Sequence, residues 1–468
     1  MAFSEDTICA VSTAPGTGGI AVIRVSGPQA REIVDSVWRG KRLVGVTSHT
    51  AHLGTIVDED GEAVDQAVAT VFCAPATFTG EDVVELSVHG SAWIQREVVQ
   101  LLVRKGCRLA EAGEFTRRAF AAGKLDLAEA EAVADVIASS SRAAHRMAMS
   151  QMRGDFSRRL DMLRERLLEL ASLLELELDF SEEDVEFASR DKLRALATEI
   201  HEVVNRLASS FATGSALKEG VPVAIVGATN AGKSTLLNRL LGDDRAIVSD
   251  IHGTTRDIIE DRTEIGGIQF RLIDTAGLRD TDDVVETLGI DRTVRQIDNA
   301  AIVLWVVDQS ASAEDINDTW QRISVHLGEN QKLIIALNKS DISSTNSEQA
   351  FAPMANVAEL ADSSQPVILR ISAATGDGIG NLEKALVDAS GANSWQGDIM
   401  VTNARHYEAL TRSLDSIDRV IAGLDAGISG DFIAQDVRET LHHLGTITGT
   451  ITTTDILSTI FSRFCIGK

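Results

Sequence analysis

Residues 227–235 read GATNAGKST, between the short apolar run Val221–Val226 and a leucine-rich stretch that begins at Leu236. A glycine, four further residues and then Gly-Lys-Ser are typical of the loop that joins a strand to a helix and cradles phosphate groups. Its glycines let backbone N–H groups turn toward phosphate oxygens, and the helix start adds its positive dipole end. Lys233 is expected to reach the β- and γ-phosphates, and the Ser234 hydroxyl to hold Mg²⁺. The stretch therefore predicts a nucleotide site; the alternative is an ordinary glycine-rich turn.

The region around this loop, residues 219–389, alternates strand and helix patterns, as in a doubly wound sheet. The candidate strands are Val221–Val226, Gln269–Asp274, Ala300–Val307, Lys332–Leu337 and Val367–Ile371. Before and after this region, apolar residues recur at helical spacings. Examples are Leu163, Leu167, Leu170 and Leu174 before it, and Ile433, Val437, Leu441 and Leu444 after it. The economical interpretation is one helical domain interrupted by an inserted α/β domain, although two separate helical regions would give the same pattern.

The first 118 residues have an α+β pattern. Short strands are expected at Thr7–Val11, Ile20–Val25, Val68–Phe72 and Val83–Val88, followed by a helix at Ala92–Lys105. The predicted fold class is therefore multidomain α/β. Its parts are an N-terminal α+β domain at 1–118, a helical part at 119–218, the inserted P-loop domain at 219–389 and a second helical part at 390–468.

Four further motifs specify the nucleotide. A threonine of Gly253–Asp257 (GTTRD) can complete the Mg²⁺ shell, and Asp274–Gly277 (DTAG) can hold that shell through water and touch the γ-phosphate. In Asn338–Asp341 (NKSD), the last carboxylate can accept from guanine N1–H and from the exocyclic amine, which adenine lacks. Ser372–Ala374 closes the base pocket. Each motif is weak alone, but their order is that of translation-factor-like GTPases and favours GTP over ATP.

The predicted GTP-binding residues extend over all five motifs. They are Asn230, Ala231, Gly232, Lys233, Ser234, Thr235, Ser249, Thr254, Thr255, Asp274, Thr275, Ala276, Gly277, Asn338, Lys339, Asp341, Ser372, Ala373 and Ala374. Ser234 and Thr255 are the predicted Mg²⁺ ligands. One position departs from the usual pattern: Leu278 follows DTAG where many GTPases place a glutamine that orients the attacking water. Leucine cannot bind water, so the catalytic group must come from elsewhere.

Composition limits the classes of function. The 468 residues carry a formal net charge of −25, which argues against a broad electrostatic surface for nucleic acid. The N-terminus has early acidic residues and no basic segment followed by an apolar one, and no apolar run is long enough to span a membrane. Four separated cysteines without CxxC spacing fit reduced thiols. A cytoplasmic location is expected.

The chain resembles the family of tRNA wobble-uridine modification GTPases known as MnmE or TrmE. The resemblance is carried by the inserted GTPase domain, by GTTRD and DTAGLRD, and by the terminal Cys465–Lys468 (CIGK). Further matching stretches are PGTGGIAVIRVSG near the N-terminus, FTGEDVVEL at Phe78–Leu86, GEFTRRAF at Gly113–Phe120 and GKLDLAEAEAVADVI at Gly123–Ile137. It covers essentially the whole chain.

The resemblance implies a potassium-activated GTPase whose G domains pair across a homodimer. Asn230, Ser249, Ile251 and Thr254 match the potassium ligands of the family. Such a cation would neutralise charge that develops on the phosphates during transfer. Glu286 matches the catalytic glutamate, which would compensate for Leu278; without the resemblance it reads as a solvent-facing acid.

The resemblance also implies that the N-terminal domain binds 5-formyltetrahydrofolate or a related folate and forms the dimer. Arg24, Glu85, Lys124 and Lys468 match the folate-contacting residues, and Cys465 matches the C-terminal cysteine. Implied partners are tRNA and a flavoprotein of the MnmG/GidA family, which carries the FAD, in a heterotetramer. Together they would add a carboxymethylaminomethyl or aminomethyl group to C5 of the wobble uridine (U34).

Two rival functions remain at this stage. A switch-type GTPase in ribosome or ribonucleoprotein assembly would carry the same sheet motifs, but would have no use for the CIGK tail. A folate-dependent transferase with a regulatory G domain would turn over without hydrolysing GTP.

Overall fold

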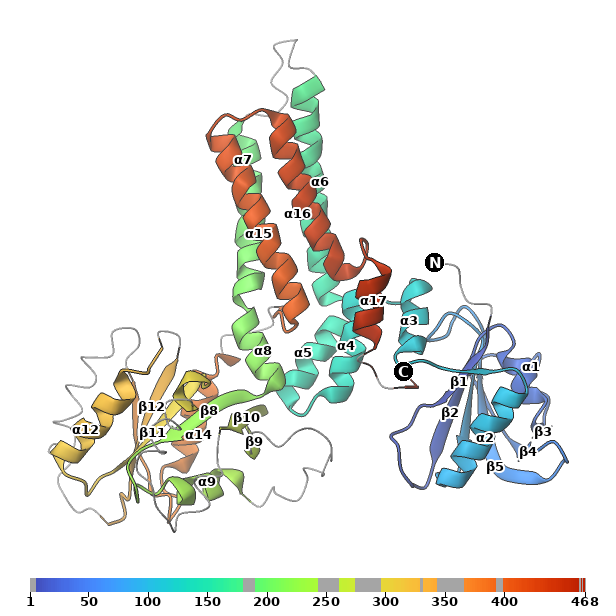
Figure 1. The fold of residues 1–468 in the computed structure, drawn as a ribbon, viewed down its shortest axis with the longest axis horizontal. Coiled ribbons are helices and arrows are strands. Elements are labelled where there is room, and N and C mark those ends of the chain that lie inside the picture. Colours follow the sequence, from blue (N-terminus) through green and yellow to red (C-terminus); the bar gives the residue numbers. More distant parts are fainter. Residues whose placement is uncertain are drawn as a thin grey trace. The chain divides into compact units, whose positions relative to one another are not determined.

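The computed structural model describes residues 6–179, 190–242, 261–273, 296–328, 331–342, 366–392, 399–462, 464 and 466–467. Contacts divide the chain into two compact units (Figure 1). Unit 1 comprises Met1–Ile137, Met149–Glu202 and Ala409–Lys468, and unit 2 comprises Ala138–Ala148 and Val203–Glu408. The four domain boundaries expected from the sequence remain a prediction.

Unit 1 begins with a seven-stranded sheet in the order β3-β4-β5-β6-β2-β1-β7. The strands are β1 (Ile8–Val11), β2 (Ala21–Ser26), β3 (Trp38–Gly40), β4 (Thr50–Val57), β5 (Ala63–Phe72), β6 (Val83–Val88) and β7 (Arg108–Leu109). Helices α1 (Ala30–Asp35) and α2 (Ala92–Arg104) pack on one face. Alternate strand residues such as Ile23 and Leu86 pack against helix residues such as Leu101 in this core, as the period of two along a strand requires.

The second face of this sheet meets the first helix of the helical region, α3 (Glu114–Ala121). Phe115 of this helix is fully buried against Ile8, Ala10 and Ala110. Arg24 and Glu85 point to this face because they pair with Ala10 and with each other across neighbouring strands. The face therefore carries polar side chains beside a small apolar contact.

The helices of unit 1 bury the stripes that their spacing predicts. They include α4 (Leu127–Ala138), α6 (Asp155–Asp179), α16 (Gly430–Thr448) and α17 (Thr454–Phe461), with parts of α5 (Arg142–Met152), α7 (Arg190–Ser209) and α15 (Ala404–Asp425). Leu167 and Leu170 of α6 and Val437 of α16 are fully buried, and α6 packs against α16 although more than 250 residues separate them. On α15, the helical spacing predicts a buried stripe of Ala404, Tyr407, Leu410, Leu414, Ile417 and Ile421. The buried face is rotated from this stripe, since Tyr407 is 40% exposed whereas Val420 is buried.

Unit 2 contains a six-stranded sheet in the order β13-β12-β11-β8-β10-β9. The strands are β8 (Val221–Val226), β9 (Asp261–Ile265), β10 (Ile268–Leu272), β11 (Ile302–Asp308), β12 (Lys332–Asn338) and β13 (Val367–Arg370). All neighbouring pairs are parallel except β10 with β9. Helices α8 (Phe211–Glu219), α9 (Lys233–Leu241) and α14 (Ile379–Ala389) share a core on one face, and α12 (Ala313–Ser324) covers the other. The predicted doubly wound sheet is confirmed.

Four strands were missed by the sequence analysis: β3, β4, β7 and β9. In β4 exposed and half-buried residues predominate, so its sequence lacks the apolar run of a central strand. Gly54 in this strand lies under the Trp38 ring, where a Cβ atom would come within 2.3 Å of the ring carbon Cζ2. A glycine that reads as a turn signal is thus required here for close packing between two strands.

Among the described residues, no helix is both long enough and apolar enough to cross a bilayer.

Candidate functional site

The phosphate loop follows the carboxyl end of β8 and precedes α9, as in other nucleotide-binding open sheets. Gly227 has φ +148°, and an added Cβ atom would lie 2.2 Å from the Val306 carbonyl oxygen. Gly232 has φ +94°, and its added Cβ would lie 2.2 Å from Nδ2 of Asn338. Asn230 also adopts a positive φ of 64°. Both glycines are therefore required by the backbone path and by neighbouring atoms, so their positions in the loop sequence have a local physical cause.

Lys233, the first residue of α9, folds back over this loop. Its Nζ donates to the carbonyl oxygens of Gly227, at 2.8 Å, and of Ala228, at 2.7 Å. Burial lowers the pKa of the Lys233 ammonium. A half-buried cation that donates to carbonyl dipoles suits a phosphate anion. The cradle and its lysine thus fit a nucleotide phosphate, and the Ser234 hydroxyl beside it is of the donor type that Mg²⁺ accepts.

The residues predicted to bind the base lie at the carboxyl ends of neighbouring strands. Asn338 ends β12, is 2% exposed, and donates from Nδ2 to the Ala231 carbonyl oxygen at 2.8 Å. Its Oδ1 accepts from the Ala373 amide at 2.9 Å, so one side chain bonds the phosphate loop to the 372–374 loop. Ser372 Oγ donates to Oδ1 of Asp341 at 2.6 Å. The second Asp341 oxygen and the loop amides are the groups that a guanine edge needs.

The structure also adds Asp308, a residue that the sequence analysis did not single out. Lys339 has φ +65°, and its Nζ lies 2.6 Å from Oδ2 of Asp308 at the end of β11. Burial raises the Asp308 pKa, but hydrogen bonds from Lys339 and Ser310 outweigh it, so this pKa is lowered. The register that places Asp308 opposite Asn338 brings the pair together. An aspartate at the end of an apolar strand was the available signal.

Several predicted residues lie outside the described part of the chain. These are Ser249, Ile251, Thr254, Thr255, Asp274, Thr275, Ala276, Gly277, Glu286, Cys465 and Lys468. The structure therefore brings together the phosphate loop and the base loops, Asn230–Thr235, Asn338–Asp341 and Ser372–Ala374. In the described ranges, no three His, Cys, Asp or Glu side chains form a group that could hold a metal ion.

A second candidate site lies on the polar face of the unit 1 sheet. Arg24 contacts Glu85, with Nε and Nη2 at 2.9 and 2.8 Å from the same carboxylate oxygen, Oε1. The guanidinium lies between two rings, 5.6 Å from the centre of Phe78 and 5.5 Å from that of Phe115. Phe115 is buried, whereas Phe78 is 39% exposed. A paired charge beside an open aromatic ring suits a flat heterocycle with polar edges.

Of the other predicted folate residues, Lys124 is described by the structure, as is the chain up to Gly467. The stem of Lys124 passes Gly80, where an added Cβ would lie 3.5 Å from its Cε. Gly467 accepts a hydrogen bond on its carbonyl oxygen from Ser12 Oγ at 3.0 Å, and Ile466 forms an isolated bridge with Ala112. The C-terminal segment thus reaches the end of β1, the strand beside Arg24, and Lys468 is the next residue.

The parallel sheet, the phosphate loop at its carboxyl edge and the guanine-type base pocket define a P-loop GTPase. The particular family follows from comparison with known proteins. A model described as "GTP-binding protein TrmE N-terminus" matches residues 7–124, and one described as "MnmE helical domain" matches residues 127–465. The chain belongs to the MnmE (TrmE) family.

Curated relatives agree over the full length. Proteins named "tRNA modification GTPase MnmE" from Parabacteroides distasonis and Bacteroides thetaiotaomicron are 50% and 51% identical, covering 99% of this chain and 100% of each relative. Among solved structures, Era in complex with MgGDPNP and a 16S ribosomal RNA fragment is 23% identical, covering 42% of this chain and 65% of that chain, with a TM-score of 0.28.

Proposed function

We propose that this chain is a potassium-activated GTPase that modifies tRNA. With a flavoprotein partner of the MnmG/GidA family, it adds a carboxymethylaminomethyl or aminomethyl group to C5 of the wobble uridine (U34) of certain tRNAs. The observation that carries the proposal is that one chain holds both a GTP-type pocket and a polar sheet face with the Arg24–Glu85 pair. Full-length identity of about half with proteins named tRNA modification GTPase supports it.

In GTP binding, each part of the pocket has a separate task. Lys233 exchanges its two carbonyl contacts for β- and γ-phosphate oxygens. Ser234 and Thr255 hold Mg²⁺, which supplies charge neutralisation when bound. Asp341 accepts from the guanine edge, and Lys339, held by Asp308, covers the base.

In hydrolysis, Glu286 orients the attacking water, because Leu278 cannot. Asn230, Ser249, Ile251 and Thr254 provide oxygen ligands for K⁺, which supplies positive charge near the phosphates when bound. Asn230 supports this part of the proposal, since it is exposed and lies within the phosphate loop itself.

In the folate site, Arg24, Glu85, Lys124 and Lys468 bind 5-formyltetrahydrofolate or a related one-carbon folate. Glu85 and Arg24 recognise the polar edges of the heterocycle, and the two lysines suit its carboxylates. Cys465, which matches the C-terminal cysteine of the family, is a candidate participant in the modification step.

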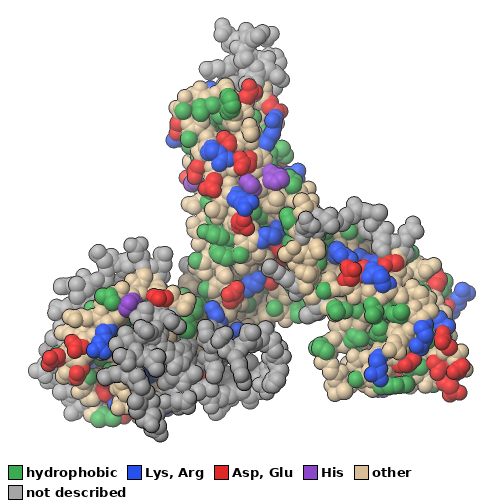
Figure 2. Space-filling model, in the orientation of Figure 1, with side chains coloured by type: hydrophobic (Ala, Val, Ile, Leu, Met, Phe, Trp, Pro, Cys, Tyr) green, Lys and Arg blue, Asp and Glu red, His purple; other side chains and the backbone are tan. Residues whose placement is uncertain are grey.

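The proposed assembly is a cytoplasmic homodimer that joins the flavoprotein in a heterotetramer. Figure 2 shows Lys, Arg, Asp and Glu side chains interspersed along the helical part of unit 1. Together with the net charge of −25, this mixture of charges supports a partner that supplies most of the contacts to tRNA.

The deciding experiment is nucleoside analysis of tRNA from a strain that lacks this gene. Modified wobble uridines should disappear and return with the wild-type gene. The Glu286→Ala gene should fail to restore them, although its product still binds GTP. Unchanged wobble uridines in the deletion strain would overturn the proposal, and full rescue by Glu286→Ala would favour the folate transferase with a regulatory G domain.

Potassium and folate are tested separately on the full chain. GTP hydrolysis should be faster in KCl than in NaCl at equal ionic strength, and Asn230→Ala should remove the difference while Asn381→Ala, an exposed change on α14, keeps it. Arg24→Ala should weaken binding of 5-formyltetrahydrofolate, and Arg104→Ala on α2 should not. Equal rates in both salts would remove the Asn230 assignment.

A further inference from the structure

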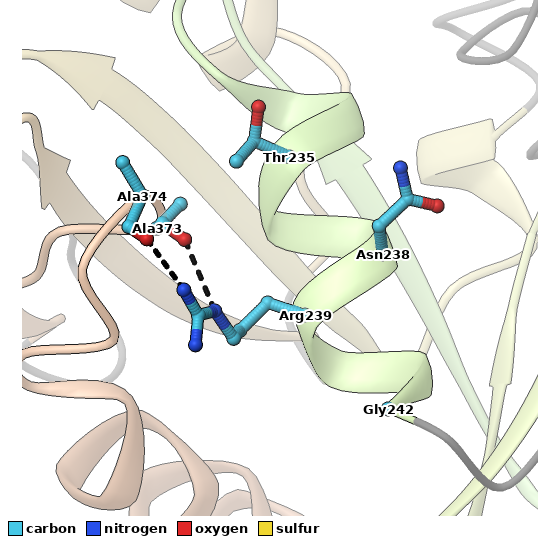
Figure 3. A pocket seen from close by; sticks show the side chains of 6 residues that line it. All are labelled: Thr235, Asn238, Arg239, Gly242, Ala373 and Ala374. Atoms are coloured by element: carbon cyan, nitrogen blue, oxygen red, sulfur yellow. Dashed lines mark hydrogen bonds between the residues drawn. The ribbon is translucent and has the colours of Figure 1, made fainter.

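Arg239 joins the phosphate-loop helix to the base loop. It lies on α9, and its Nε donates to the Ala373 carbonyl oxygen at 3.2 Å while Nη2 donates to that of Ala374 at 2.5 Å (Figure 3). These residues, with Thr235, Asn238 and Gly242, line a cavity of about 380 Å³. No motif in the sequence marks Arg239, because the phosphate-loop pattern ends at Ser234.

The 372–374 loop is bonded to the phosphate-loop side at two points. Asn338 accepts from the Ala373 amide and donates to Ala231 in the phosphate loop, and Arg239 holds the Ala373 carbonyl from α9. Gly376 lets the loop approach the guanidinium, since its added Cβ would lie 3.1 Å from Nη1 of Arg239. Ala373 is thus held at both its N–H and its C=O group.

The direction of the carbonyls determines the direction of the amides. In a planar trans peptide the C=O of one residue and the N–H of the next point in opposite directions. When Arg239 draws the Ala373 carbonyl toward α9, the Ala374 N–H must point away from α9. The planar guanidinium suits this role because its fork donates to two acceptors with a fixed geometry.

We infer that Arg239 is a positioning residue for base recognition. It orients the Ala374 amide of the 372–374 loop so that this N–H donates to the 6-oxo group of guanine and rejects the 6-amino group of adenine. This inference rests on the proposed GTP site and deepens it, since it assigns part of the selectivity to a contact between α9 and the base loop.

The test compares nucleotides that use the loop with one ligand that does not. In Arg239→Ala, the Kd for GTP should rise about tenfold, the Kd for ATP should stay close to its wild-type value, and GTP-over-ATP selectivity should fall about tenfold. The loss should fall on KM rather than on kcat. Competition by Mg²⁺-tripolyphosphate, which has no base, should be unaffected.

Two further variants distinguish positioning from general stability. Arg239→Lys keeps the charge without the planar fork and should recover part of the selectivity. Arg322→Ala, an exposed arginine on α12, should leave all values unchanged. The inference would be overturned if Arg239→Ala kept the GTP-over-ATP selectivity of the wild type, or if it bound GTP and tripolyphosphate equally more weakly. If Arg239→Ala does not fold, the same two outcomes are measured on Arg239→Lys. A wild-type protein without preference for GTP would instead overturn the proposed function.

Discussion

At the scale of single residues, the base pocket depends on side chains that each bond two loops. Asn338 joins the phosphate loop to the 372–374 loop, and Asp341 is held by Ser372. A buried amide group with both of its polar atoms bonded is fixed in orientation, because leaving either atom without a partner costs about 1–3 kcal/mol. Selectivity for the base is therefore built from a few oriented donors and acceptors.

Asp341→Asn should convert nucleotide selectivity from GTP to XTP. Xanthine carries a carbonyl where guanine carries its exocyclic amine, so the new amide can donate where the carboxylate accepted. Affinity for GTP should fall at least about 100-fold, and XTP should become the better ligand. Competition binding measures both, with Asp315→Asn on α12 as the control. A variant that binds neither nucleotide, although it is folded, would contradict the role of Asp341.

At the scale of elements, a buried ionic network joins α3 to the unit 1 sheet. Arg108 contacts Glu114 at 2.5 Å, and Arg118 contacts Asp6, Glu81 and Glu114 at 2.7, 3.0 and 3.2 Å. The Glu114 side chain is 2% exposed. Burial raises its pKa, but hydrogen bonds from Arg108, the Glu111 amide and Arg118 outweigh that effect and lower it to about 2. The charged form of Glu114 therefore stabilises the contact between helix and sheet.

This network should make the stability of unit 1 depend on pH. A carboxyl group with pKa 4.5 when unfolded and about 2 when folded stabilises the protein above pH 4.5. That contribution, about 3 kcal/mol, is lost as pH falls from 4.5 toward 2. Glu114→Gln should remove it at pH 7 and flatten the acid limb of the unfolding curve. Glu111→Gln, whose side chain is 64% exposed, should cost less than about 1 kcal/mol; equal effects would contradict the role of burial.

At the scale of the whole molecule, the C-terminal segment of unit 1 meets the first strand of that unit. Gly467 lies against β1 with φ +97°, and an added Cβ would lie 2.2 Å from the Val11 carbonyl oxygen. Phe461 and Phe464, just before it, pack with Leu127 of α4. A packed apolar segment thus precedes the residues that lie against the end of β1.

Gly467→Ala should release this terminal segment from β1. The new methyl group cannot fit beside Val11, and alanine is strained at this φ. Faster removal of the last residues by carboxypeptidase, and weaker folate binding, should follow. Gly380→Ala, whose added Cβ has no atom within 4 Å, is the control. Identical digestion of Gly467→Ala and wild type would contradict the contact.

Nucleotide binding should separate the unfolding transitions of the two units in calorimetry. GDP with Mg²⁺ at 100 times its Kd should stabilise the unit that holds the phosphate loop by about 2.7 kcal/mol. The transition of unit 2 should then shift upward by roughly 5–10 °C, while that of unit 1 stays in place. ATP at the same concentration is the control. Equal shifts of all transitions with GDP would contradict two independent units.

The sequence alone determined those features whose cause is local. GATNAGKST predicted the phosphate loop because the backbone path itself requires glycine at 227 and 232. The strands of unit 2 were readable because central parallel strands, such as Ile302–Asp308, are buried on both faces and appear as continuous apolar runs. Resemblance over the full length identified the family, which the comparisons confirmed.

Only the tertiary structure decided which distant residues meet. Strand register pairs Asp308 with Asn338 and so brings Lys339 to Asp308; the same kind of pairing sets Arg24 beside Glu85. β4 was missed because one of its faces is largely open, and the Arg239 contact was missed because Ala373 lies 134 residues away. Local patterns record what each residue needs from its own backbone, whereas these contacts depend on how separate segments pack together.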